Sequence, residues 1–221
     1  MTLPRPELLV ECRPAPNPRR VRIFLAEKGL EIPTEQVDIM TGAHFGDHAG
    51  RVGTYHVPAL KLSDGSWLTE SMAICRYVEA LVPEPCLMGA DALSAARIEM
   101  WQRRVEFELF SPIAQVLRHG NPKMAVLEDQ CPEWAEANIP RVHKGLAMLE
   151  RRLGESLHVG NEDFSVADIT AVVALDFLRT IRIEIQEQAT ATRAWFEKMG
   201  ERPSVMASRA KPAAATAEVA G

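Results

Sequence analysis

Two short motifs place groups that suit a peptide and its carboxylate close together in the chain. Val57-Pro58 heads an apolar run of strand type, and Glu70-Ser71 opens a helical pattern soon afterwards. A cis peptide costs least before proline, and a cis bond here would turn the N–H and C=O of Val57 outward for pairing with an extended peptide. Free N–H groups at a helix start favour an anion, which places Ser71 to hold a carboxylate. Together the motifs predict a receptor for a small acidic peptide. Each residue also has an ordinary structural explanation when it is considered alone. Pro58 would only start a strand, Ser71 would only cap a helix, and Glu70 would only complement the helix dipole.

These motifs are positioned by a hairpin and the helix that follows it. Asp64-Gly65 lies between two apolar runs and is a strong hairpin signal. Beyond Ser71 the apolar residues recur at intervals of three and four, which is typical of a helix; they are Ile74, Tyr77, Val78 and Leu81.

The preceding residues predict a strand, a helix and a second strand. The apolar run 8–12 ends in a proline-rich loop, and a helix follows with Asn17 in the capping position and Gly29 at its end. Alternation over 32–40 indicates the second strand. We expect five charged side chains to cover the wet side of the helix: Arg19, Arg20, Arg22, Glu27 and Lys28. Strand-helix-strand followed by a hairpin and a helix implies a mixed sheet in an α/β domain.

The strand signal ends at a proline-containing linker, and only helical patterns follow. They cover Ala92–His119, which contains Pro112 as a kink or break, then Trp134–Leu153 and roughly 190–200. Between the last two, Ser165 and Asp168 have the spacing of a capping box that opens an apolar, central helix.

Composition divides the chain and excludes several classes of protein. We expect an α/β domain over 1–82, a linker over 83–91, an all-α domain over 92–207 and a disordered, low-complexity tail over 208–221. The net charge of −5 argues against a nucleic-acid surface, and no apolar run is long enough for a membrane span or a secretory leader. The sequence therefore predicts a cytoplasmic protein. Its four cysteines form no C-x-x-C and no metal-binding spacing, so no metal site is expected.

Three stretches in order resemble the cytosolic glutathione transferases, and the resemblance extends over residues 7 to about 206. They are 17–29, His56–Leu60 with Glu70–Ile74, and Ser165–Asp168. The resemblance implies a thioredoxin-like domain followed by an all-helical domain, usually in a homodimer. It implies detoxifying transferase activity with glutathione as a substrate.

The family's ligand gives the receptor residues specific roles. The resemblance implies that the cysteine backbone of glutathione pairs with Val57, next to Pro58. Glu70 would face the γ-glutamyl ammonium, and Ser71 its carboxylate. His56 and His44 are candidates for the glycine carboxylate, although a lone histidine is more often a surface or core residue.

The chain departs from the family at the residue that activates the glutathione sulfur. Members place Tyr, Ser or Cys there, and the aligned residue in this chain is Ala15. Asn17 resembles the asparagine of a bacterial group, and its amide would stabilise the thiolate if it is more than a helix cap. Cys12, inside the first strand, is an alternative sulfur, although a cysteine in a strand is usually a core residue.

A second, electrophilic substrate is expected between the proline-rich loop and the long helix after 92. Its candidate walls are Pro14, Ala15, Phe107, Phe110 and Leu117. Helical spacing also suits ordinary core residues, and the sequence leaves the substrate's identity open. Four functions remain: conjugation of glutathione to an electrophile, glutathione-dependent reduction of disulfides or peroxides, glutathione binding without turnover, and an unrelated role as a helical interaction protein fused to a thioredoxin-like domain.

Overall fold

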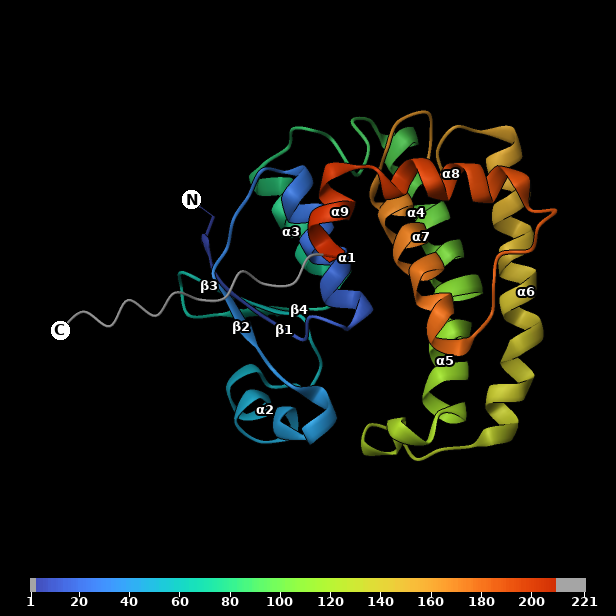
Figure 1. Cartoon of the computed structure of the whole chain (residues 1–221). Helices are drawn as coiled ribbons and strands as arrows, with labels where there is room; N and C mark the ends of the chain where they lie inside the picture. Colours follow the sequence, from blue (N-terminus) through green and yellow to red (C-terminus); the bar gives the residue numbers. More distant parts are fainter. Residues whose placement is uncertain (1–2, 210–221) are drawn as a thin grey trace.

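A four-stranded sheet lies beside a group of long helices in the computed structural model, which describes residues 3–209 (Figure 1). The strands are β1 (Pro6–Glu11), β2 (Thr34–Gln36), β3 (Ala59–Leu62) and β4 (Trp67–Thr69). Their order is β2-β1-β3-β4; β1 pairs with β2 in parallel, and the other two pairs are antiparallel. The mixed sheet predicted from the sequence is confirmed. The second strand is shorter than the predicted 32–40, and a 3-10 helix occupies Ile39–Thr41.

Helices cover both faces of the sheet. In Figure 1, α1 (Pro16–Glu27) and α3 (Ser71–Leu81) lie on one side of the strands, and α2 (Asp47–Val52) lies on the other. The hairpin and the helix after it therefore occur as predicted, with Ser71 as the first residue of α3.

The start of α1 differs from the prediction by two residues. Ala15, in extended conformation, is the capping residue, Pro16 is the first helical residue, and Asn17 lies inside the first turn. Proline lacks an N–H and has a fixed φ, so it fits the first helical position without losing a hydrogen bond. The prediction that Asn17 caps the helix was wrong, because Pro16 rather than Pro18 begins it.

Two side chains expected on the wet face of α1 are buried. Arg20 is 1% exposed and Lys28 is 6% exposed. With Phe24 they recur every fourth residue and so share the face of α1 that is turned inward. Each charge is paired with a half-buried carboxylate: the ammonium of Lys28 lies 2.6 Å from Glu79, and Nη1 of Arg20 lies 3.2 Å from Glu106.

The remaining helices form the second half of the chain, beginning with a long interrupted helix. This runs as α4 (Ala92–Val105), a π-helical turn (Glu106–Phe110) and α5 (Ser111–Gly120), with Pro112 in the first turn of α5. The others are α6 (Pro132–Glu155), α7 (Val166–Phe177), α8 (Thr190–Gly200) and α9 (Pro203–Arg209). An α/β half followed by a helical half confirms the predicted fold class.

The sequence did not predict α9. Ser208 is buried in it and Arg209 ends it, so both residues assigned to the tail belong to a helix. The rest of the predicted tail, 210–221, lies outside the described residues.

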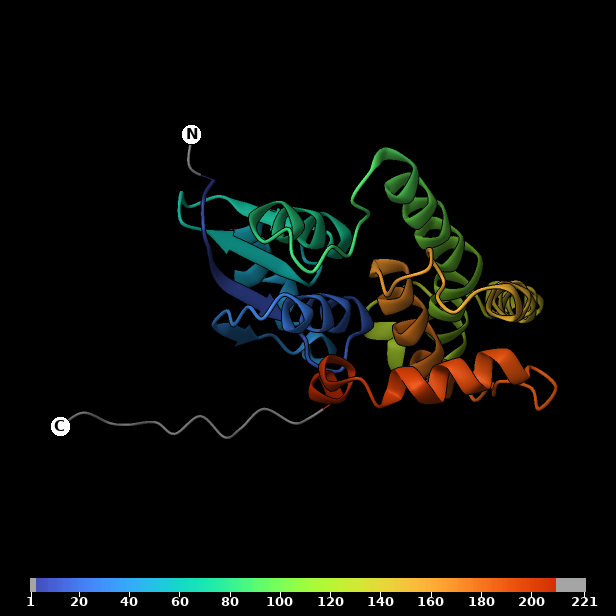
Figure 2. The ribbon, with the colours of Figure 1, turned by 90° about the horizontal axis from the view of Figure 1, so that it is seen from above.

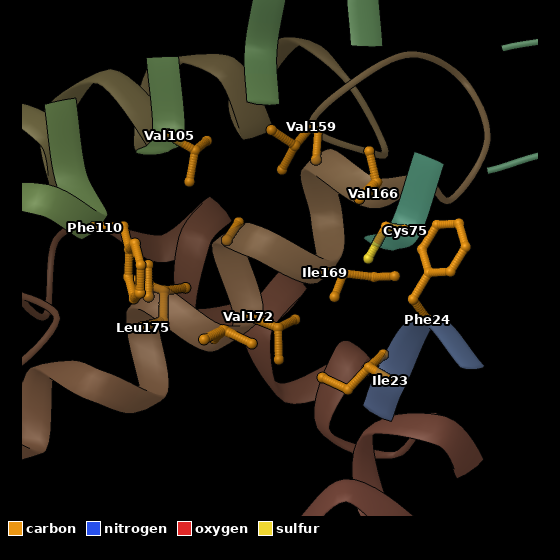
Figure 3. Close-up of a cluster of buried hydrophobic side chains, with 14 of the residues drawn as sticks. Ile23, Phe24, Cys75, Val105, Phe110, Val159, Val166, Ile169, Val172 and Leu175 are labelled. Atoms are coloured by element: carbon orange, nitrogen blue, oxygen red, sulfur yellow. The ribbon is translucent and has the colours of Figure 1, made fainter. Parts of the chain in front are cut away.

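A single apolar core joins the two halves. Figure 3 shows Ile23 and Phe24 of α1 close to Ile169 and Val172 of α7, and all four are at most 1% exposed. The helix α7 is buried along almost its whole length, as expected for a central helix, and the Ser165–Asp168 capping box is present at its start. From above, α7 lies next to α1 and the other long helices surround it (Figure 2).

Within residues 3–209, none of the helices combines the length and apolar character required to span a membrane.

Candidate functional site

The candidate site begins where β3 begins. The Val57–Pro58 peptide is cis, as the peptide-receptor hypothesis requires. Pro58 is buried, and Ala59, the next residue, pairs with Val10 on one side and Thr69 on the other. Val57 is therefore half-buried and lies two residues before β3, just outside the paired part of the sheet.

The start of α3 lies beyond the other end of the hairpin. Glu70 is its capping residue, with φ at 66°, and its side chain is exposed. Ser71 follows as the first helical residue and is 5% exposed. Its Oγ accepts a hydrogen bond of 2.8 Å from Nη1 of Arg20. A serine that accepts one bond still has its own proton to donate, so Ser71 can present a donor to a carboxylate at a helix N-terminus.

Arg20 connects this helix start to the helical half of the chain. Its Nη1 also donates to Oε1 of Glu106 at 3.2 Å, and its guanidinium lies over the ring of Phe110 at 5.3 Å. Burial lowers the pKa of Arg20, and the Glu106 carboxylate opposes that effect. Its buried Nε and Nη2 have no hydrogen-bond partner among the described residues.

Three histidines gather on the other side of the sheet, around the segment before β3. His44 is 2% exposed and its ring lies 4.0 Å from that of Phe45 and 6.3 Å from that of Tyr55. Burial lowers the pKa of His44, and the neighbouring His48 and His56 lower it further. At neutral pH His44 is therefore a neutral donor or acceptor rather than a cation.

His48 supports the backbone next to the cis peptide. It is 2% exposed, and its Nε2 lies 3.0 Å from the carbonyl oxygen of His56. His56 itself is exposed and has Thr54 Oγ1 within 3.3 Å of its Nδ1. Of the two histidines proposed for the glycine carboxylate, only His56 presents its ring to solvent.

The start of α1 provides the groups expected to act on a sulfur. Asn17 is half-buried in the first turn, and its amide has no hydrogen bond to another described residue. Cys12 directly follows β1 rather than lying inside it as expected; it is 4% exposed, and burial raises its pKa. Burial also raises the pKa of Cys75, to about 12, although Arg20 opposes the shift. Both thiols are therefore protonated at neutral pH and are poor nucleophiles.

The residues expected around a second substrate differ in exposure and in the side chains that they contact. Phe107 is 57% exposed and has Arg103 over its ring, whereas Phe110 is buried, with its ring 5.9 Å from that of Phe177. Leu117 and Ala15 are half-buried, and Pro14 is exposed. Pro14 lines a cavity that also involves α7 and α9.

Comparison with known proteins decides the family. Residues 15–81 match the family model described as glutathione S-transferase, N-terminal domain, and residues 132–198 match the corresponding C-terminal domain. Glutathione S-transferase 2 of Saccharomyces cerevisiae is 32% identical over 195 residues, which cover 86% of this chain and 84% of the relative. The chain belongs to the glutathione transferase family.

Solved structures of glutathione transferases agree with this assignment. The crystal structure of Gtt2 from Saccharomyces cerevisiae has a TM-score of 0.86 and 30% identity, covering 91% of this chain and 99% of that chain. A Gtt2-class glutathione S-transferase of Vibrio parahaemolyticus has a TM-score of 0.81 and 32% identity, covering 91% of this chain and 96% of that chain.

For a glutathione transferase, the geometry adds two residues to those expected from the sequence. Arg20 touches Ser71, and His48 supports the backbone ahead of Val57. Arg20 was assigned to the wet face because it is charged, although its spacing from Phe24 places it on the buried face. His48 lies in a segment interpreted as a loose loop, where periodicity carries no signal.

Proposed function

We propose that this glutathione transferase binds glutathione between the cis-proline segment and the start of α3, and activates its thiol for attack on an electrophilic, hydrophobic substrate. One observation carries the proposal: the Ser71 hydroxyl stands at a helix N-terminus on the same hairpin-helix unit as the cis Val57–Pro58 peptide. An extended peptide edge beside an anion-favouring helix start suits a peptide with a terminal carboxylate.

Each part of glutathione has a partner in this proposal. The backbone of its cysteine pairs with Val57 as an added strand would. The γ-glutamyl carboxylate takes the Ser71 hydroxyl, and the ammonium faces the exposed Glu70 carboxylate. For the glycine carboxylate, the exposed ring of His56 is the better donor. His44, being buried with a lowered pKa, acts as a neutral support.

The thiolate is stabilised at the start of α1. The Asn17 amide has no other partner among the described residues and is available to donate to the sulfur. The dipole of α1 adds on the order of 0.3–1 kcal/mol. The thiol proton passes to solvent, the sulfur forms a bond to the electrophilic carbon, and a leaving group such as chloride departs with the electron pair. This follows the bacterial pattern in which an asparagine replaces the usual Tyr or Ser.

A reductase is the second candidate, because Ala15 supplies no hydroxyl or thiol. There, bound glutathione would attack a disulfide to give a mixed disulfide, and a second glutathione would release oxidised glutathione and the reduced product. Burial raises the pKa of Cys12, which disfavours a part for the protein's own thiol in either reaction. Glutathione binding without turnover is a third possibility.

Conjugation of glutathione to a chlorinated dinitrobenzene tests the proposal. We expect turnover by the purified protein, and Asn17→Ala should lower kcat about tenfold or more, as loss of one hydrogen bond to a charged group implies. Asn161→Ala, in a loop of the helical half, is the matched control and should leave kcat unchanged. Equal rates in the Asn17→Ala variant would remove Asn17 from the mechanism.

A hydroxyethyl disulfide assay separates the reductase. Faster disulfide reduction than aryl conjugation would favour it, whereas no glutathione affinity by calorimetry would contradict both enzymatic functions. The homodimer, the cytoplasmic location and the division of the chain at 83–91 remain predictions from the sequence.

A further inference from the structure

The peptide unit between His56 and Val57 contains the N–H group on which the proposed glutathione site depends. This peptide is trans, because the cis peptides of residues 3–209 are Val57–Pro58 and Glu84–Pro85. A trans peptide unit is planar, and its C=O and N–H point in opposite directions. Any contact that fixes the His56 carbonyl oxygen therefore also fixes the direction of the Val57 N–H.

The buried side chain of His48 binds this carbonyl oxygen. Its Nε2 lies 3.0 Å from the oxygen of His56, and the residue is 2% exposed. A carbonyl oxygen only accepts hydrogen bonds, so Nε2 must carry the proton that is donated. Nδ1 of the same ring is buried and has no hydrogen-bond partner among the described residues. Within residues 3–209, the bond to the His56 carbonyl is thus the one hydrogen bond of this ring.

The helix that carries His48 is itself attached to the sheet. In Figure 1, α2 lies on the side of the strands opposite α1 and α3. Arg51 of α2 donates from Nη1 to Oε2 of Glu35 in β2 at 3.2 Å, and its Nε lies 3.0 Å from the carboxylate of Asp47. Glu35 in turn is paired with Val10 of β1. These contacts connect the turn of helix around His48 to the strands, so the imidazole is supported by the sheet.

The two ends of the segment 56–57 differ in their hydrogen bonding. The His56 N–H donates to Oγ1 of Thr54 at 3.3 Å, and the ring of His56 lies 4.3 Å from that of Tyr55. The Val57 N–H, in contrast, donates to no group between residues 3 and 209. The peptide unit is therefore fixed at its oxygen, and its N–H is available to a ligand.

We propose that His48 is a positioning residue for glutathione, because its hydrogen bond to the His56 carbonyl directs the Val57 N–H away from the His48 ring and toward the backbone of the glutathione cysteine. The inference rests on the proposed glutathione site and names the residue that orients its donor. A donor whose direction is set before the ligand arrives loses less conformational entropy on binding. Since His48 is buried beneath this segment, its loss should weaken glutathione binding and leave the chemical step unchanged.

Two variants at His48 separate the hydrogen bond from the packing of the ring. His48→Phe keeps an aromatic ring of similar shape and removes the donor, whereas His48→Gln keeps a side-chain N–H for the carbonyl. In calorimetry of the full chain, His48→Phe should weaken glutathione binding about three- to tenfold, as loss of one hydrogen bond implies, and His48→Gln should stay within about twofold of the wild type. His143→Phe, at an exposed histidine of α6, is the matched control and should bind glutathione as the wild type does.

Steady-state kinetics distinguish positioning from general damage to the fold. In His48→Phe the KM for glutathione should rise, while kcat and the KM for the chlorinated dinitrobenzene stay unchanged. Equal glutathione affinities in His48→Phe and His48→Gln would overturn the inference, because the hydrogen bond would then have no effect of its own. A wild-type chain that binds no glutathione would instead overturn the proposed function on which the inference rests.

The tautomer of His48 provides a test that needs no ligand. Nitrogen-15 NMR of the imidazole should show the proton on Nε2 in the wild-type chain at neutral pH. A proton on Nδ1 alone would leave no donor for the His56 carbonyl and would overturn the role of His48, whether or not glutathione binds.

Discussion

At the level of single residues, the hydrogen bond between Arg20 and Ser71 links the proposed glutathione site to the folded core. Ser71 Oγ accepts from a guanidinium that is 1% exposed, so the direction of its own O–H is restricted by that bond. The same guanidinium holds Glu106 of the helical half. The donor proposed for the glutathione carboxylate is thus oriented from both halves of the chain.

Replacing Ser71 by alanine tests this arrangement. We expect the KM for glutathione to rise about five- to twentyfold, since one hydrogen bond to a charged group is lost, while kcat changes less. The free energy of unfolding should fall by about 1–3 kcal/mol, because Arg20 loses a buried acceptor. Steady-state kinetics and urea denaturation provide the two measurements. Ser66→Ala, in the exposed hairpin turn, should change neither, and an unchanged KM for Ser71→Ala would exclude Ser71 from glutathione binding.

At this scale the sequence predicts which residues gather but not every contact. The Glu70-Ser71 pair was sufficient to predict the helix start, and the cis bond that the receptor hypothesis required before Pro58 is present. The burial of Arg20 was predictable from its four-residue spacing to Phe24. Its contact with Glu106 was not, because the two residues are 86 positions apart and only the tertiary fold brings them together.

Two helices begin with a capping box, and the two boxes differ in burial and therefore in their expected contribution to stability. At α4, Asp91 and Ser94 form an exposed box, whereas at α7 Ser165 and Asp168 form a buried one. Asp168 is completely buried and accepts from the N–H of Val159 at 2.9 Å as well as from both the N–H and the hydroxyl of Ser165.

Alanine at the two capping aspartates should separate these roles. Asp168→Ala leaves several buried donors without an acceptor, and we expect a loss of about 3 kcal/mol or more in the free energy of unfolding. Asp91→Ala removes an exposed cap and should cost about 1 kcal/mol. Urea denaturation followed by circular dichroism measures both. Equal losses would mean that burial adds nothing to the capping box.

Helices and strands were predicted correctly where the nearby sequence contains a clear capping motif or apolar periodicity. The central helix was predicted from its capping box and its apolar surface, and α8 from its periodicity. The short β2 and α9 were missed or misjudged. Thr34–Gln36 is held by parallel pairing to β1, and Ser208 of α9 by a 3.0 Å hydrogen bond from Arg19. Both depend on contacts that a local pattern does not contain.

In the whole molecule, the core that joins the halves determines how the chain unfolds. Prolines predict a boundary near 83–91, but periodicity alone does not show that Ile23 of α1 meets Ile169 of α7. Figure 3 shows these side chains in one cluster, and both are fully buried. The paired carboxylate and guanidinium of Glu27 and Arg202, 2.6 Å apart, reinforce the same junction. We therefore expect the two halves to unfold together.

Ile169→Ala tests that cooperativity. A cavity in the shared core should lower the free energy of unfolding by about 2–5 kcal/mol. Because α7 supports both halves, native-state hydrogen exchange should show the same loss of protection at Val10 and Leu60 in the sheet as at Val142 in α6. Leu157→Ala is the control, since that side chain is 70% exposed and its truncation should change protection by less than about 0.5 kcal/mol. Loss of protection confined to the helical half would mean that the sheet retains its stability when α7 is weakened, and that the shared core does not couple the two halves.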